Sequence, residues 1–158
     1  MTGLEVIDAA LLDAVTAEAR SSPRRRKNRN LHAAESEPCN RLLNAVEPDS
    51  YVAPHRHLDP DKDETFAVLR GRFGVIAFDD QGGVSGTSVF EAGTNRMAAT
   101  VAHGTWHTLV SLQPGSVFLE AKGGPYAPLL QEERAPWAPA EGAPDAPAYL
   151  ERLRGLFG

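Results

Sequence analysis

The sequence predicts a mainly β protein, built as a sandwich or jelly-roll barrel with an inner cavity, with a helix before the barrel and a proline-rich arm after it. Short runs rich in β-branched and aromatic residues follow one another from about Cys39 to Lys122. Turn residues separate these runs at regular intervals, which is typical of such barrels. The length of 158 residues falls within the range of one domain with its own hydrophobic core.

The N-terminal segment predicts an amphipathic helix. Asp8 is a suitable N-cap, because its side chain can accept a hydrogen bond from the first helical turn. Leu11, Leu12, Val15 and Ala19 then follow at helical spacing, so they form one apolar stripe. We expect this stripe to pack on a sheet.

The central segment predicts a series of strands with breakers between them. Pro48-Asp49-Ser50, Gly71, Asp79 to Gly83, Gly93 and Pro114-Gly115 supply the turns. The predicted strands are Arg41 to Val46, Tyr51 to His57, Thr65 to Arg70, Phe73 to Phe78, Val84 to Glu91, Arg96 to Val101, Trp106 to Leu112 and Val117 to Lys122.

The C-terminal segment changes in character after Tyr126. Proline recurs from Pro128 to Pro147, and proline lacks the N–H that a central strand needs, so we expect this arm to wrap the surface. A short helix is predicted from about Ala146 to Leu156. The expected organisation is residues 1–38 as helix and basic segment, 39–126 as barrel and 127–158 as arm and helix.

Composition narrows the class of protein. A net charge of -5 argues against a general nucleic-acid binder, which needs a positive surface along the phosphates. The start of the chain lacks the features of a signal peptide, and no run is apolar enough to span a membrane, so we expect a cytoplasmic protein. Cys39 is the single cysteine. We expect its side chain to be a small buried apolar group rather than a nucleophile.

Histidine and carboxylate residues predict a metal site. In a strand, His55 and His57 would point to one side, because alternate residues share a face. Glu64 and His107 would complete three imidazoles and one carboxylate, a set that suits Fe, Mn, Ni or Zn. Asp61 remains an alternative to Glu64 as the carboxylate ligand, whereas His32 and His103 are left outside the predicted shell.

These residues resemble the paired motifs of the cupin superfamily. The resemblance implies a single cupin barrel, which is a double-stranded β-helix of jelly-roll type, with the four residues above as metal ligands. Four departures stand out: no Gly opens the first motif, His103 takes the place of a usual Pro, Ser111 replaces a terminal Asn, and six residues separate His57 from Glu64 where three or four are usual. The matching positions are His55-Arg56-His57, Glu64 and Gly71 for the first motif, and Gly93, Gly104 and His107 for the second.

Beyond the barrel motifs, the chain is similar to the WbuC family of cupin-fold metalloproteins, which is associated with bacterial surface-polysaccharide gene clusters. The family implies a metal-binding fold but no established reaction. The similar stretches are Arg26 to His32, Arg41 to Ala45, Glu120 to Tyr126 and Ala135 to Pro139.

Further residues are candidates for ligand binding or catalysis. Glu120 and Lys122 share a strand face and are predicted to line the cavity as an acid/base group and an anion anchor, with an outward salt bridge as the alternative. Tyr51 is a substrate-binding candidate with the same two alternatives. Arg26 and Lys27 belong to the basic run Arg24 to Lys27, which is either a solvated linker or an anion-binding segment at the barrel mouth.

The expected function is binding of a small polar metabolite, such as an anionic sugar derivative, at an open position of the metal. An isomerase or epimerase, an iron-dependent dioxygenase and a metal-dependent sensor or accessory protein all fit the ligand set. We expect no nucleic-acid or membrane partner, and a homodimer is one assembly compatible with the sequence.

Overall fold

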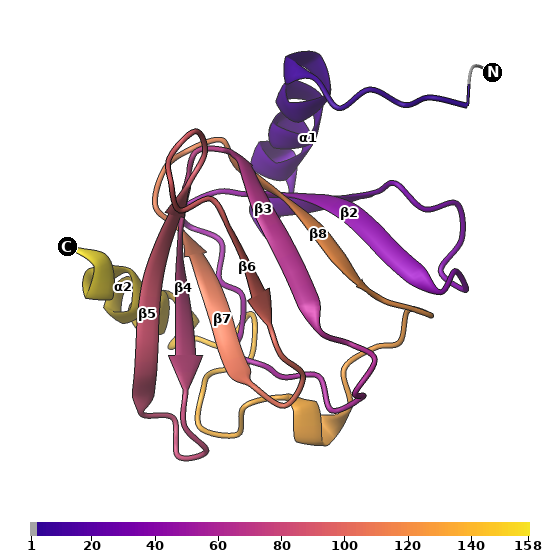
Figure 1. Cartoon of the computed structure of the whole chain (residues 1–158). Coiled ribbons are helices and arrows are strands. Elements are labelled where there is room, and N and C mark those ends of the chain that lie inside the picture. Colours follow the sequence, from indigo (N-terminus) through magenta and orange to yellow (C-terminus); the bar gives the residue numbers. More distant parts are fainter. Residues whose placement is uncertain (1–2) are drawn as a thin grey trace.

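The computed structural model describes residues 3–158 and consists of two antiparallel sheets packed face to face, with a helix outside each (Figure 1). The first sheet has the strand order β1-β2-β8-β3-β6 and the second the order β5-β4-β7. Within the described part of the chain, neither helix has the length and apolar character that a membrane span requires. The elements are α1 (Ala9–Ser21), β1 (Arg26–Asn30), β2 (Cys39–Val46), β3 (Glu64–Arg70), β4 (Arg72–Phe78), β5 (Val84–Glu91), β6 (Ala98–Val101), β7 (Trp106–Ser111), β8 (Ser116–Gly123), a 3₁₀ turn (Gln131–Glu133), α2 (Ala146–Arg154) and a final 3₁₀ turn (Gly155–Phe157).

The predicted N-terminal helix is confirmed. The Asp8 side chain accepts a hydrogen bond from Leu11 N–H at 2.9 Å and caps α1. Leu12, Val15 and Ala19 are buried on one side of this helix, against the outer face of the five-stranded sheet. The predicted C-terminal helix is also present as α2, and it covers the outer face of the three-stranded sheet through Leu150 and Leu153.

The space between the sheets is filled by aromatic side chains at one end only. Phe66 packs edge-to-face on Phe90 and on Phe118, and Phe118 packs in the same way on Phe73. Phe73 is 1% exposed, so this end is closed. Polar side chains occupy the other end of the same interior, where the candidate site lies.

The prediction of a strand from Tyr51 to His57 is wrong. This segment is extended but forms only isolated bridges at His55. Pro54 offers no N–H to a ladder, and its carbonyl accepts a hydrogen bond from Ala135 of the C-terminal arm at 3.2 Å. The arm thus takes over part of the pairing that a neighbouring strand would provide.

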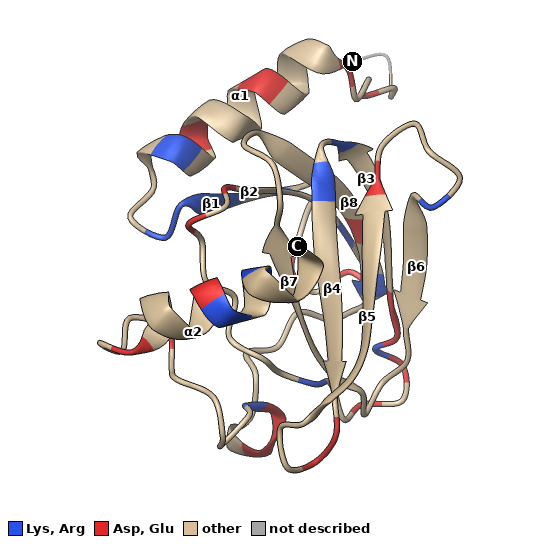
Figure 2. Cartoon of the chain, turned by 90° about the vertical axis from the view of Figure 1, so that its left-hand side faces the viewer, with Lys and Arg blue, Asp and Glu red and all other residues tan. Residues whose placement is uncertain are grey.

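The basic run contains a strand that the sequence did not predict. β1 pairs with β2 along its whole length, from Arg26 opposite Val46 to Asn30 opposite Leu42. The interpretation of this run as a solvated linker is therefore wrong. In Figure 2, charged residues gather on α1, α2 and the loops, whereas β4, β5 and β7 carry few charges.

Candidate metal centre

Backbone pairing brings His55 and His107 together at the open end of the barrel. His55 N–H donates to the carbonyl of His107 at 3.0 Å, and His107 N–H donates to the carbonyl of His55 at 2.9 Å. The two ring centroids are 4.6 Å apart. His57 follows in the same extended segment, with its ring centroid 5.4 Å from that of His55, and Gly104 N–H donates to its carbonyl at 2.6 Å.

The orientations of two imidazoles are fixed by the backbone. His55 Nδ1 donates to the carbonyl of Ala53 at 3.0 Å, and His107 Nδ1 donates to the carbonyl of Thr105 at 2.8 Å. In a neutral ring this leaves the lone pair on Nε2, which is how metal-binding histidines are commonly held. Burial, and next the neighbouring His107, lower the pKa of His55 to about 3, so its ring is neutral at physiological pH.

Glu64, the first residue of β3, lies between the other two imidazoles. Its Oε1 is 3.1 Å from His57 Nε2 and its Oε2 is 2.7 Å from His107 Nε2, while Lys122 Nζ donates to Oε1 at 3.0 Å. Burial alone would raise the pKa of Glu64, but the hydrogen bonds from both histidines and the charge of Lys122 outweigh it and hold that pKa well below its usual range. The side chain is therefore a carboxylate.

The donor set fits a divalent transition metal. His107 offers a lone pair at Nε2 once Nδ1 is bonded to the backbone, so Nε2 and the carboxylate can lie 2.7 Å apart only with a positive charge between them. Burial would lower the pKa of His107, but the hydrogen bond to Glu64 and the charge of Glu64 outweigh burial and raise it.

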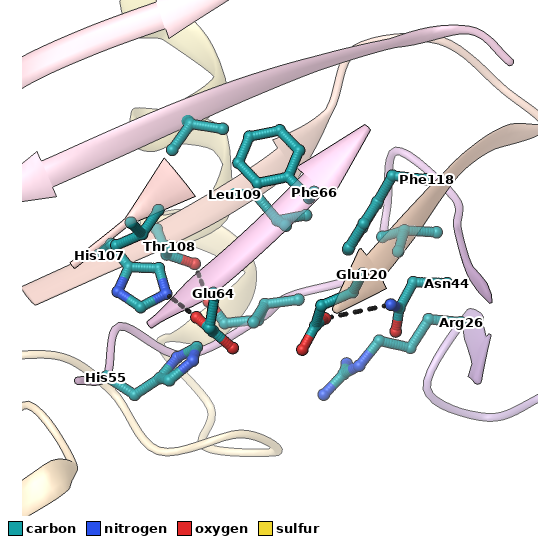
Figure 3. Close-up of a pocket in the computed structure, with 14 residues that line it drawn as sticks. Arg26, Asn44, His55, Glu64, Phe66, His107, Thr108, Leu109, Phe118 and Glu120 are labelled. Carbon is teal, nitrogen blue, oxygen red and sulfur yellow. Dashed lines mark hydrogen bonds and ion pairs between the residues drawn. The ribbon is translucent and has the colours of Figure 1, made fainter. Parts of the chain in front are cut away.

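The distances support the same conclusion. Ligand bonds of about 2.1 Å that meet near a right angle separate neighbouring donor atoms by about 3 Å, close to the separations of Glu64 from His57 and His107. Donor atoms of His55, His57 and Glu64 all lie within 4.8 Å of one another. Figure 3 shows His55, Glu64 and His107 converging on one point.

A second pair of charged groups lies beside this cluster. Lys122 Nζ is 3.0 Å from Glu64 Oε1 and 3.2 Å from Glu120 Oε1, and Asn44 Nδ2 donates to Glu120 Oε2 at 3.2 Å. Burial raises the pKa of Glu120, although Lys122 opposes this shift. Burial would lower the pKa of Lys122, but the two carboxylates raise it. Glu120 is thus the carboxyl group here that most readily holds a proton.

The cluster lies where two hollows meet. An inner cavity of about 110 Å³ has the aromatic wall of Phe66 and Phe118, and His55, Glu64 and Glu120 reach into it. The same three residues also line an outer hollow of about 570 Å³, which is bounded by β1, β2 and the start of the C-terminal arm. The polar cluster therefore separates an apolar interior from a polar mouth.

The predicted substrate-binding residues lie in different places. Arg26 lines the inner cavity, and its guanidinium donates to the carbonyl of Tyr51 at 2.9 Å and pairs with Glu141 of the arm at 2.7 Å. Lys27 is on the opposite face of β1, where it pairs with Glu18 of α1 at 3.1 Å. The Tyr51 ring is packed in the core below α2, away from the cluster.

The other candidates lie outside the cluster. Asp61 is exposed in the turn before β3, so the structure brings Glu64 and not Asp61 between the histidines. His103 is exposed and pairs with Asp63 at 2.8 Å. His32 is buried, and its Nδ1 is 3.1 Å from the backbone nitrogen of Arg41. Cys39 is exposed, so the expectation of a buried thiol is wrong.

Sequence reasoning missed a set of asparagines, three of which line the mouth while the fourth, Asn44, lines the inner cavity. The sequence signal for them is that asparagines recur at positions sharing one face of β1 and of β2. This pattern can be recognised only once β1 is known to be a strand. They are Asn28, Asn30, Asn40 and Asn44.

Solved structures share this fold at low sequence identity. KdgF from Halomonas sp. has a TM-score of 0.51 and 18% identity over 65% of this chain and 82% of that one. A conserved protein of unknown function from Streptococcus pyogenes, SPY1581, has a TM-score of 0.53 and 11% identity over 80% and 93%. An oxalate decarboxylase from Lactobacillus farciminis has a TM-score of 0.46 and 18% identity over 57% of this chain and 25% of that one.

These likenesses confirm the predicted cupin fold and say nothing more specific about activity. No curated protein matches the sequence. A family model described as a domain of unknown function, DUF6016, matches residues 7–90, which is more than half of the chain. The chain therefore belongs to the DUF6016 family.

Proposed function

We propose that this chain is a metalloprotein that binds a sugar or sugar acid at a divalent transition metal held by His55, His57, Glu64 and His107. The observation that carries the proposal is the Glu64 carboxylate lying 3.1 Å and 2.7 Å from two imidazole nitrogens. Carboxylate and imidazole donors suit iron, manganese, nickel and zinc alike, so the proposal covers this group of metals.

The proposed reaction is isomerisation or epimerisation of the bound sugar. A bound metal would act as a Lewis acid on a carbonyl or hydroxyl oxygen. Glu120 is the proposed acid/base group, because burial raises the pKa of this carboxyl and so makes it a better proton acceptor than Glu64, whose pKa is lowered. Lys122 lies between Glu120 and Glu64 and is proposed to keep both carboxylates in position and to anchor an anionic group of the ligand.

A role in surface-polysaccharide metabolism is a narrower proposal. It is supported by the similarity of two stretches to the WbuC family, Arg26 to His32 and Glu120 to Tyr126. Both stretches border the outer hollow, so the similarity extends beyond the metal ligands to the walls around them.

Metal analysis joined to proton exchange tests the proposal. Protein purified without added metal should contain close to one transition-metal ion per chain. In D₂O, the metal-loaded protein should exchange the C–H proton next to the carbonyl of at least one member of a panel of aldoses, ketoses and uronic acids, as followed by NMR. Glu120→Gln should keep the metal and lose the exchange. No exchange with any panel member would refute the catalytic role, and no metal uptake would refute the site.

A further inference from the structure

The polar surface beside the metal centre continues across the five-stranded sheet as a row of side-chain amides. Asn28 and Asn30 share the inner face of β1 with Arg26, and Asn28 lies opposite Asn44 of β2. Asn40 of β2 lies opposite Lys122, which lies opposite Glu64 of β3. We call the four asparagines, Asn28, Asn30, Asn40 and Asn44, the carboxamide band.

One member of this band lacks a partner. Asn40 is only 3% exposed, and its side-chain oxygen has no hydrogen-bond partner among residues 3–158. Asn40, Asn28 and Asn30 all line the outer hollow of about 570 Å³. Buried polar groups are nearly always partnered, so the unpartnered side-chain oxygen of Asn40 beside this hollow indicates a place where a ligand group belongs.

The charges around the band favour an uncharged ligand group. Arg24 and Arg26 are both paired with Glu141, at 2.8 Å and 2.7 Å. Lys27 and Arg29 are on the other face of β1, where they pair with acidic residues. A side-chain amide both donates and accepts hydrogen bonds, as a hydroxyl group does, so the band matches a surface of hydroxyl groups better than a phosphate.

The extent of the band sets the size of the ligand. Three strand spacings separate β3, which carries Glu64, from β1, and neighbouring strands are about 4.8 Å apart, so the distance is about 14 Å. A ligand that touches both ends is longer than a single sugar ring. Tyr126, which is 56% exposed, lines the same hollow and offers an aromatic surface to the C–H groups of a sugar.

We propose that the carboxamide band is a saccharide subsite, which binds the uncharged, hydroxyl-rich part of a ligand of at least two sugar rings whose other end lies at the metal. The inference rests on the proposed function for the metal-bound end. The band itself stands on the unpartnered Asn40, the strand register and the charge pairing.

NMR titration of the ¹⁵N-labelled, zinc-loaded protein tests the subsite. Probes are cellobiose, maltose and lactose, compared with D-glucose and with succinate. At least one disaccharide should shift the side-chain amide signals of Asn40 and Asn28, with a Kd about tenfold lower than that of D-glucose, as about 1.4 kcal/mol of added contacts would give. Succinate should not shift these signals.

A double variant and a matched control on the same strand locate the effect. Asn28→Val with Asn30→Val should raise the Kd for the disaccharide about tenfold or more, and each single variant serves if the double variant does not fold. Lys27→Gln with Arg29→Gln changes the opposite face of β1 and should leave the Kd unchanged. Equal affinity in both double variants, or no shift of Asn40 with any disaccharide, overturns the subsite.

The same titration on metal-free protein separates the two proposals. Disaccharide shifts of Asn40 together with no zinc uptake would refute the proposed metal function and keep the subsite. Stoichiometric zinc binding without disaccharide shifts of Asn40 would refute the subsite and keep the proposed metal site.

Discussion

Glu141 connects the proline-rich arm to the mouth of the barrel, and replacing it with Gln should destabilise the fold by about 2 to 4 kcal/mol. Its carboxylate pairs with Arg24 and Arg26. The Arg24 side chain is 62% exposed, so this pair contributes about 0.2 to 1 kcal/mol. The Arg26 side chain is 13% exposed, so losing its charged partner costs about 1.5 to 3 kcal/mol even though its bonds to Ser50 and to the Tyr51 carbonyl remain.

Urea unfolding measures this difference, and its pH dependence tests the cause. Burial would raise the pKa of Glu141, but Arg24 and Arg26 outweigh it and lower that pKa. The stabilisation is then complete above the unfolded carboxyl pKa of about 4.3 and is lost as the pH falls through the lower folded value. The parent and Glu141→Gln should therefore differ fully at pH 7 and converge as the pH falls from the unfolded carboxyl pKa through the lowered pKa of the folded state.

Asp49→Asn is the matched control. It breaks the ion pair of Arg25 and Asp49, whose side chains are 37% and 63% exposed, and should cost less than about 1 kcal/mol. The result would contradict a stabilising role of these ion pairs if the free energies of unfolding of Glu141→Gln and the parent differ by less than about 0.5 kcal/mol at pH 7. A difference that does not depend on pH would contradict it as well.

Three further predictions concern the metal centre and its border. His57→Ala should remove most bound metal and leave a folded barrel, as metal analysis and circular dichroism can determine; stoichiometric metal would argue against the assignment. Glu64→Gln should weaken zinc binding by more than about a hundredfold, since an outer change alone costs about ten- to a hundredfold, whereas Asp61→Asn should leave it unchanged; the reverse ranking in a zinc titration would assign the role to Asp61. The backbone N–H of His103, and next its side chain, lower the pKa of Asp63. His103→Ala keeps the backbone bond and removes the side-chain bond, so it should raise the carboxyl pKa measured by ¹³C NMR part of the way towards its usual value, and an unchanged value would contradict the side-chain contact.

Most of the architecture could be predicted from the sequence because the core strands and the helices carry periodic apolar residues. β4 buries Ile76 and Phe78 on one face and Phe73 on the other, and α1 buries Leu12 and Val15 at helical spacing. β1 could not be predicted in this way, because its residues are all charged or carboxamide residues and its inner face is turned to a polar hollow. Because β1 was not predicted, the sequence also did not indicate that Arg26 and Lys27 lie on opposite faces of a strand.

The convergence of the candidate ligands could be predicted from motif spacing, although the local backbone could not. An alternating His-x-His indicates two side chains on one side of an extended chain, and both imidazoles do reach the cluster. The extended segment from Tyr51 to His57 forms β-bridges only at His55. One of these bridges is to Arg134 of the C-terminal arm. A contact across that many residues leaves no periodic signal in either segment.

X-ray absorption spectroscopy of the metal-loaded protein tests the central claim most directly, because it reports the atoms around the ion. The donor set predicts imidazole scattering from His55, His57 and His107 with an oxygen shell at about 2.0 to 2.2 Å. The imidazole signal should weaken in His57→Ala. A spectrum without imidazole scattering, or one unchanged by that substitution, would contradict the site.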